Sequence, residues 1–320
     1  MKKIANLFIL FVITILLVSC GNNKTADIVT TMFPQYDFAK QIVGDKMTVS
    51  LLIPPGAEVH DFEPTSKDMV MIREARLFIF TSLEIDQWIG NLSKIGGDNT
   101  VVLNLSEAYI LAEHEHDEEH EEDQDDEHLD DEHDHDHELH FWVDPTTAIQ
   151  LIDAILEQIV LIDPENETFY RLNAANYKEE IEDLHHELEE FLMHEPYLES
   201  SIYFAGHNAM GAFAERYHLN IITLYESFQP DADLISNEFI AFVDAVRASG
   251  TSYLFIEEIS DPKAALKIVN EFKNYDITLL ELHGYHNVSK KDMEDGVTYA
   301  ILLARNLEHL RLALVVASIT

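Results

Sequence analysis

Short apolar runs alternate with segments of helical spacing in two parts of the chain. The first part covers residues 27–112 and the second runs from residue 201 to the end. The apolar runs are short and β-branched, which is typical of buried strands. Because strand–helix alternation is typical of parallel sheets covered by helices, the pattern predicts two α/β lobes. The predicted strands are Ile28–Met32, Val49–Ile53, Leu77–Thr81, Ser201–Ala205, Asn220–Leu224, Tyr253–Ile256 and Ile277–Leu280.

Residues 146–196, between the two alternating parts, carry apolar side chains at helical spacing throughout. Asp163 and Pro164 interrupt the pattern. The segment after them, at about 1.5 Å per residue, is long enough to run most of the length of a domain. We therefore predict an N-terminal lobe (27–145), a connecting helical region with one long helix (146–196) and a C-terminal lobe (197–320). The predicted helices within the lobes are Tyr36–Val43, Ser66–Ala75, Ala209–Tyr217, Asn237–Ala248, Pro262–Phe272 and Thr298–Val316.

The N-terminus has the features of a bacterial lipoprotein precursor. Two lysines precede the apolar run Leu7–Val18, which ends in Leu17-Val18-Ser19-Cys20. We predict a signal peptide (1–19), lipidation of Cys20 and a tether (20–26) that holds the protein on the extracytoplasmic face of the cell membrane. An uncleaved anchor helix or an ordinary signal peptide are the alternatives. Cys20 is the only cysteine, so disulfides and cysteine-based metal sites are excluded.

The segment from Glu113 to His140 is a low-complexity block with 17 acidic residues and 8 histidines. It has almost no apolar side chains to bury, so residues 113–139 are predicted to form a mobile loop. The whole chain carries a net charge of −40, which argues against nucleic acid as a partner and suits cations. The loop is predicted to collect metal ions, or else is only a solvated segment that binds them weakly.

Three histidines stand where predicted strands or ordered segments meet loops. His60 follows a strand and a Pro-Pro-Gly turn, His140 precedes an aromatic segment, and His207 ends a strand. Because ligands of α/β folds bind at the C-terminal ends of strands, these side chains are candidate metal ligands. Glu281, just beyond the last predicted strand, is the candidate for a fourth. The residues that compete with Glu281 for this role are Glu58, His283 and His286, and water is a further alternative.

Three motifs resemble the ligand-bearing motifs of the ZnuA-like zinc and manganese solute-binding proteins of ABC transporters. They are Gly56–Pro64, His140–Pro145 and Gly206–Ala209, in that order. The resemblance extends over nearly all of the chain after Cys20. It implies two α/β lobes joined by one long helix, with His60, His140 and His207 as ligands of a metal between the lobes. It also implies a C-lobe carboxylate as the fourth ligand, in a motif that lacks its usual proline around Glu281. Gly206 replaces a common serine, which we expect to matter little for coordination.

Ligand type predicts zinc, because three neutral imidazoles with one carboxylate or water suit tetrahedral Zn²⁺. Manganese members of the family resemble a site with more oxygen ligands, so Mn²⁺ is the alternative. The resemblance implies a permease and an ATPase as partners, and we expect a monomer that is not an enzyme. A zinc-dependent surface enzyme would need a general acid or base beside the metal, and no His-Glu-x-x-His helix is present. Adhesion or display at the cell surface would explain none of the ligand motifs.

Overall fold

The computed structural model describes residues 26–109, 139–194, 196–198, 200–225, 237–259, 263–272 and 276–317. The predicted signal peptide, Cys20, all of the predicted tether except Ala26 and all of the predicted acidic loop except Leu139 lie outside these residues.

The N-terminal lobe contains a four-stranded parallel sheet in the order β2-β1-β3-β4. Strands β1 and β3 are buried along their whole length, as expected for central strands covered on both faces. Three of the four strands were predicted from the sequence. The fourth, β4, was not, and all of its side chains are only half-buried. The strands are β1 (Ile28–Thr30), β2 (Val49–Leu51), β3 (Leu77–Phe80) and β4 (Val101–Asn104).

The C-terminal lobe repeats this topology, with a parallel sheet in the order β6-β5-β7-β8. In each lobe the second strand in sequence forms one edge, and the first, third and fourth follow. Strand β5 is two residues longer than predicted and has an irregular register between Phe204 and His207. The strands are β5 (Ser201–His207), β6 (Asn220–Tyr225), β7 (Tyr253–Ile256) and β8 (Thr278–Glu281).

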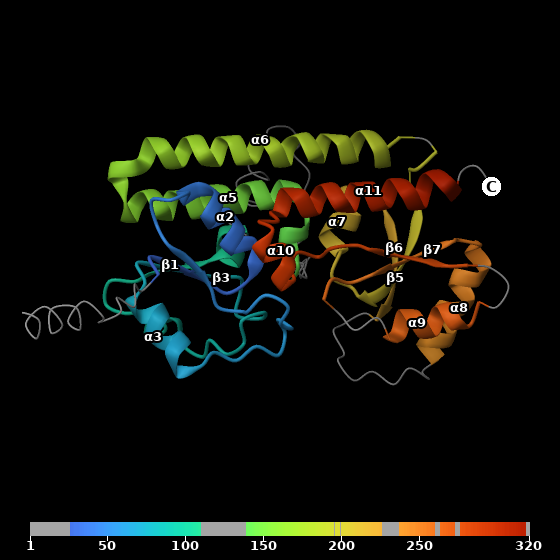
Figure 1. Ribbon diagram of the computed structural model, residues 1–320, viewed down its shortest axis with the longest axis horizontal. Coiled ribbons are helices and arrows are strands. Elements are labelled where there is room, and N and C mark those ends of the chain that lie inside the picture. The colour runs from blue at the N-terminus through green and yellow to red at the C-terminus, as the bar shows by residue number, and fades with distance from the viewer. Residues whose placement is uncertain are drawn as a thin grey trace, which may run out of the picture.

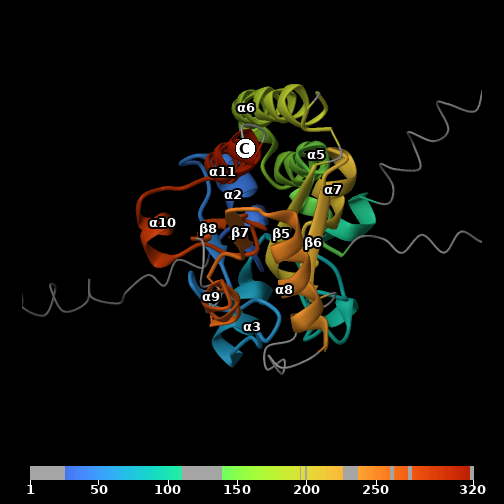
Figure 2. The same ribbon diagram turned by 90° about the vertical axis from the view of Figure 1, so that its right-hand side faces the viewer.

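Helices cover the sheets as the alternation predicted. Helix α3 begins where the sequence indicates, because the side chain of Thr65 accepts a hydrogen bond from the backbone N–H of Asp68 while the Asp68 carboxylate accepts one from the N–H of Thr65. Figure 2 shows α8 and α9 on one face of the C-terminal sheet and α11, with α6 beyond it, on the other. The lobe helices are α2 (Phe33–Val43), α3 (Ser66–Glu74), α7 (Gly211–Arg216), α8 (Asn237–Ser249), α9 (Lys263–Asn270) and α10 (Lys290–Glu294).

The three longest described helices lie on the same side of the two sheets: α5 (Pro145–Ile162), α6 (Glu167–Leu192) and α11 (Tyr299–Ala317). A short 3₁₀ turn, η3 (Pro164–Asn166), separates α5 from α6 at the predicted break. Helix α6 runs above both lobes (Figure 1), as the prediction of one long connecting helix required. Helix α5 packs on β3 and β4 of the N-terminal lobe. The limits of the connecting region at residues 146 and 196 therefore stay a prediction.

One hydrophobic core extends through both lobes. It runs from Ile28 and Leu77 in the N-terminal sheet, through Ile155 of α5 and Ile181 of α6, to Phe204 in the C-terminal sheet. Helix α5 is apolar and long enough to cross a bilayer, but its buried face belongs to this core. The shared core restricts the lobes to small relative movements, because separating them would expose apolar surface. The loops at the strand ends of both lobes are therefore held in fixed positions.

Candidate metal centre

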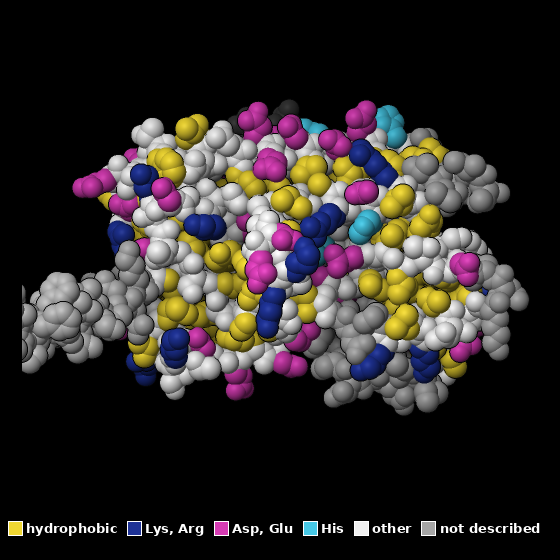
Figure 3. Space-filling model, viewed as in Figure 1, with side chains coloured by type: hydrophobic (Ala, Val, Ile, Leu, Met, Phe, Trp, Pro, Cys, Tyr) yellow, Lys and Arg dark blue, Asp and Glu magenta, His cyan; other side chains and the backbone are white. Residues whose placement is uncertain are grey.

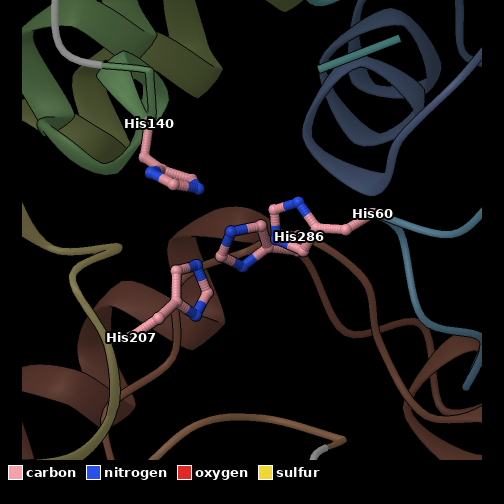
Figure 4. A group of neighbouring side chains, drawn as sticks. All are labelled: His60, His140, His207 and His286. Carbon is pink, nitrogen blue, oxygen red and sulfur yellow. The ribbon is translucent and has the colours of Figure 1, made fainter. Parts of the chain in front are cut away.

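Four histidines from four separate chain segments meet between the lobes (Figure 4). They are His60 in the loop after β2, His140 directly before the 3₁₀ turn η2 (Phe141–Val143), His207 at the end of β5, and His286 between β8 and α10. One ring nitrogen from each lies within 4.8 Å of the others. The group therefore combines histidines from both lobes.

The four rings lie nearly at the corners of a tetrahedron. The six distances between ring centroids span only 5.1 to 6.0 Å. Four points at nearly equal mutual distances define a tetrahedron, which is the coordination that Zn²⁺ adopts with nitrogen ligands. Nitrogen atoms around tetrahedral zinc lie about 3.3 Å apart, so the side chains need only a small contraction to coordinate an ion. The Nε2 atoms of all four histidines are buried.

The loop that carries His60 is tied to the segment that follows His286. The side-chain amide of Asn287 donates hydrogen bonds to the carbonyls of Pro54 (2.8 Å) and Ala57 (2.9 Å). The N–H of Gly56, which has a positive φ of 82°, donates to the carbonyl of Val288 at 2.8 Å. Such a φ favours glycine, which accounts for Gly56 in the motif. Two ligand-bearing loops from different lobes thus hold each other in place.

Glu58, one of the alternatives to Glu281 as the fourth ligand, stabilises the His60 loop through hydrogen bonds inside that loop. Its Oε1 atom accepts hydrogen bonds from the N–H groups of Val59 (2.8 Å) and His60 (3.2 Å). The side chain lines the cavity at the site but is not a member of the histidine group. Its structural contribution is therefore to the shape of the His60 loop.

His207 is oriented by Glu257, which follows β7. Oε1 of Glu257 accepts a hydrogen bond from Nδ1 of His207 at 2.6 Å and another from the His207 backbone N–H. A Cβ atom at Gly206 would lie 2.3 Å from the same oxygen. A serine there would require the end of the Glu257 side chain to move, and its effect on coordination stays a prediction.

Glu258 orients His286 in the same manner. Its Oε1 accepts hydrogen bonds from Nδ1 (2.8 Å) and from the backbone N–H (3.0 Å) of His286, and its Oε2 accepts one from the N–H of Gly284 (2.9 Å). Burial alone would raise the pKa of Glu258, but His283, His286 and these hydrogen bonds hold that pKa well below its usual range. A proton on Nδ1 of His286 leaves the lone pair of Nε2 for a metal ion.

Opposite effects act on the pKa values of His60 and His286. Burial and repulsion from His286, His207 and His140 lower the pKa of His60 to about 3. Burial also acts to lower the pKa of His286, but attraction to Glu258 outweighs it and the pKa is raised. His60 is thus neutral over the whole physiological range, as a metal ligand must be.

His140 is held by an aromatic anchor. Its ring packs edge-on against Trp142, with the centroids 5.4 Å apart. The indole N–H of Trp142 donates a hydrogen bond to the carbonyl of Gly284 (3.0 Å), and the hydroxyl of Tyr299 donates to the carbonyl of Trp142 (2.9 Å). The turn that carries His140 is therefore fixed to the same C-terminal segment that carries His286.

A cavity of about 30 Å³ lies beside three of the four histidines, His60, His207 and His286. A space of this size is large enough to hold a water molecule or an ion. Its polar side chains are those of Glu58, His60, His207, Glu257, Glu258, His286 and Asn287.

The fourth member of the group differs from the sequence prediction. His60, His140 and His207 come together as predicted, but Glu281 is not in the group, and its backbone carbonyl accepts a hydrogen bond from Nδ1 of His309 (2.6 Å). His283 is buried beside the site, with Nδ1 accepting the N–H of Tyr285 (2.9 Å). Tyr285 has a positive φ of 62°, and this turn brings His286 to the centre.

Comparison with protein families matches residues 28–313 to the family described as zinc-uptake complex component A, periplasmic (ZnuA). The chain is 31% identical over 328 residues to the high-affinity zinc uptake system protein ZnuA of Bacillus subtilis, covering 99% of both chains. It is 29% identical over 296 residues to the zinc-binding protein AdcA of Streptococcus pyogenes, covering 91% of this chain but only 56% of AdcA.

Solved structures show the same fold. The Zn(II)-bound ZnuA-like domain of Streptococcus pneumoniae AdcA superposes with a TM-score of 0.71 at 23% identity, covering 90% of this chain and 98% of the domain. The metal-dependent lipoprotein YcdH of Bacillus subtilis gives a TM-score of 0.71 at 26% identity, covering 89% of this chain and 98% of YcdH.

Proposed function

The chain belongs to the zinc-uptake complex component A (ZnuA) family, and we propose that it captures Zn²⁺ between its lobes and delivers the ion to an ABC importer. The observation that carries this proposal is the tetrahedral group of His60, His140, His207 and His286, beside a cavity large enough for an ion. The ion is cargo, so the site has to bind it tightly and yet release it. Release requires the two loops joined by Asn287 to separate. Contact with the permease would drive this separation.

The ligand set favours zinc over manganese. The family resemblance implies a carboxylate at the fourth position, and here His286 supplies a fourth nitrogen. Mn²⁺ prefers oxygen ligands, whereas imidazole suits Zn²⁺ and other late transition metals. Four neutral imidazoles leave both charges of the ion uncompensated in the first layer of ligands. The carboxylates of Glu257 and Glu258, each bonded to a ligand imidazole, supply two negative charges in the next layer.

We propose that the protein is not an enzyme. Catalytic zinc sites keep a coordination position open for water, whereas four protein ligands close a tetrahedral site. Three carboxylates that could serve as a general base line the cavity. Glu257 and Glu258 are occupied in orienting His207 and His286, and Glu58 accepts the N–H groups of its own loop. A hydrolytic reaction would require both an open position and a base.

Metal titration of single-site variants tests the proposal. In the mature chain, His207→Ala and His286→Ala should each abolish tight zinc binding, while Glu281→Gln should leave it unchanged. Zinc should bind far more tightly than manganese to the wild type. Equal or tighter manganese binding would overturn the assignment to zinc, and a loss of affinity in Glu281→Gln would restore Glu281 as the fourth ligand.

We further propose that Cys20 carries a lipid that anchors a monomeric protein to the extracytoplasmic face of the cell membrane. This rests on the sequence, because Cys20 lies outside the described residues. Replacing Cys20 with alanine should release the protein from membranes without altering zinc affinity. Retention of the variant in the membrane fraction would point to an uncleaved anchor helix.

We also propose that residues 113–139, most of which lie outside the described part of the chain, collect zinc for the cleft. Deleting them while keeping His140 should leave the affinity of the cleft unchanged but slow growth and uptake at the lowest zinc concentrations. Unchanged uptake under those conditions would show the segment to be only a solvated loop.

A further inference from the structure

A second group of possible metal ligands lies on α6, apart from the cleft. It consists of His185, His186 and Glu189, whose ligand atoms all lie within 4.8 Å of one another. Figure 3 shows histidine side chains at the surface along the upper edge of the molecule, where α6 lies. None of the three residues belongs to the cleft, so the two groups share no ligand.

The two oxygens of the Glu189 carboxylate each face one imidazole. Oε1 lies 3.5 Å from Nε2 of His185, and Oε2 lies 3.2 Å from Nδ1 of His186. Ligand atoms around tetrahedral zinc lie about 3.3 Å apart. The residues are one, three and four positions apart on a 26-residue helix, so the backbone fixes their spacing in advance.

His185 is positioned by Tyr217, the residue that follows α7. Nδ1 of His185 lies 2.8 Å from the hydroxyl of Tyr217, and both side chains are buried there. When Nδ1 donates its proton to that hydroxyl, Nε2 carries the lone pair and faces Glu189. A metal-bound histidine is commonly held by such a hydrogen bond from its other nitrogen. Burial also lowers the pKa of His185, which keeps the ring neutral.

Arg216, the residue before Tyr217, is the cation near this group. Its charge is neutralised because its guanidinium pairs with the Asp144 carboxylate at 2.8 Å. His186 and Glu189 have side-chain exposures of 64% and 40%, so an ion can arrive from solvent.

We infer that His185, His186 and Glu189 form a second, weaker Zn²⁺ site on α6, with the remaining coordination position open to solvent. Three protein ligands and one open position favour rapid exchange, in contrast to the closed four-histidine cleft. This inference is independent of the proposed function, because it would hold whatever the cleft binds.

Histidine side-chain NMR of the full mature chain tests the inference, since it reports each imidazole separately from the histidines of residues 113–139. After one equivalent of zinc has filled the cleft, further zinc should shift the ring signals of His185 and His186. The same shifts should occur in His207→Ala, which separates this result from the fate of the cleft.

Four variants complete the test. His186→Ala and Glu189→Gln should abolish the zinc-dependent shift of His185, whereas His194→Ala, a control at another exposed histidine, should preserve it. Tyr217→Phe keeps every ligand and should weaken the site about 10- to 100-fold. The inference would be overturned if the ring signals of His185 and His186 did not move at saturating zinc, or if the His185 shift persisted in Glu189→Gln. The three residues would then form only His–Glu ion pairs.

Discussion

Oε1 of Glu257 accepts a hydrogen bond from Nδ1 of His207 at 2.6 Å, in a position where a Cβ atom on residue 206 would lie only 2.3 Å from that oxygen. The carboxylate fixes the ring so that Nε2 faces the centre. Positioning of this kind governs affinity without direct contact with the ion.

Gly206→Ala should therefore weaken zinc binding by about 10- to 100-fold, as Glu257→Ala should, because each displaces or removes the carboxylate. Zinc competition against a chromophoric chelator measures the change. Gly90→Ala is the matched control, since a Cβ there meets nothing within 4 Å. Full affinity in both Gly206→Ala and Glu257→Ala would show that His207 needs no such support.

His286→Glu should convert the four-nitrogen site to three nitrogens and a carboxylate. Zinc binding should persist, while the affinity for manganese should rise relative to zinc, because Mn²⁺ prefers oxygen ligands. Parallel titrations with both ions measure the ratio. A ratio equal to that of the wild type would mean that residue 286 does not contact the metal.

Zinc affinity should fall as the pH falls through the raised pKa of His286, because protonated imidazole cannot coordinate. His60, with a pKa of about 3, should not contribute to this loss above pH 5. Affinities measured from pH 8 to 5 give the profile. Glu258→Gln removes the charge that raises the pKa of His286, so the fall should move to lower pH. A profile that keeps its position in this variant would contradict the assignment.

The buried carboxylate of Asp37 joins three helices and should make stability depend on pH. It accepts hydrogen bonds from the hydroxyl of Tyr177 on α6 and from the N–H of Tyr299 at the start of α11 (2.9 Å). Burial raises the pKa of Asp37 from 3.8 to about 6. Because the folded state holds the proton more tightly, the contribution of Asp37 to stability is greatest below pH 3.8 and is lost as the pH rises through 6, by about 3 kcal/mol.

Asp37→Asn should remove this loss, so the free energy of unfolding of the metal-free protein should fall less between pH 4 and 6.5 than in the wild type. Urea denaturation across that range measures it. Asp98→Asn, at an exposed carboxylate, serves as the control and should follow the wild type. Parallel profiles for Asp37→Asn and the wild type would refute the raised pKa.

The sequence by itself determined the two lobes, seven of the eight strands in the described part of the chain and three of the four clustered histidines. These features are local: short β-branched runs identify buried strands, and loops at strand ends identify where ligands gather. Strand β4 was missed although its sequence, Val-Val-Leu-Asn, is as short, apolar and β-branched as the predicted strands; it lies at the edge of the sheet with half-buried side chains.

Only the tertiary structure decided the fourth histidine and the residues that orient the others. The place of His286 depends on a turn at Tyr285 with positive φ and on hydrogen bonds from Asn287 to the distant His60 loop. The roles of Glu257 and Glu258 depend on the pairing of β7 with β5 and β8, which brings both carboxylates to the edge where His207 ends its strand. Contacts between residues far apart in sequence leave no periodic pattern along the chain, so these positions become visible only when the lobes are folded together.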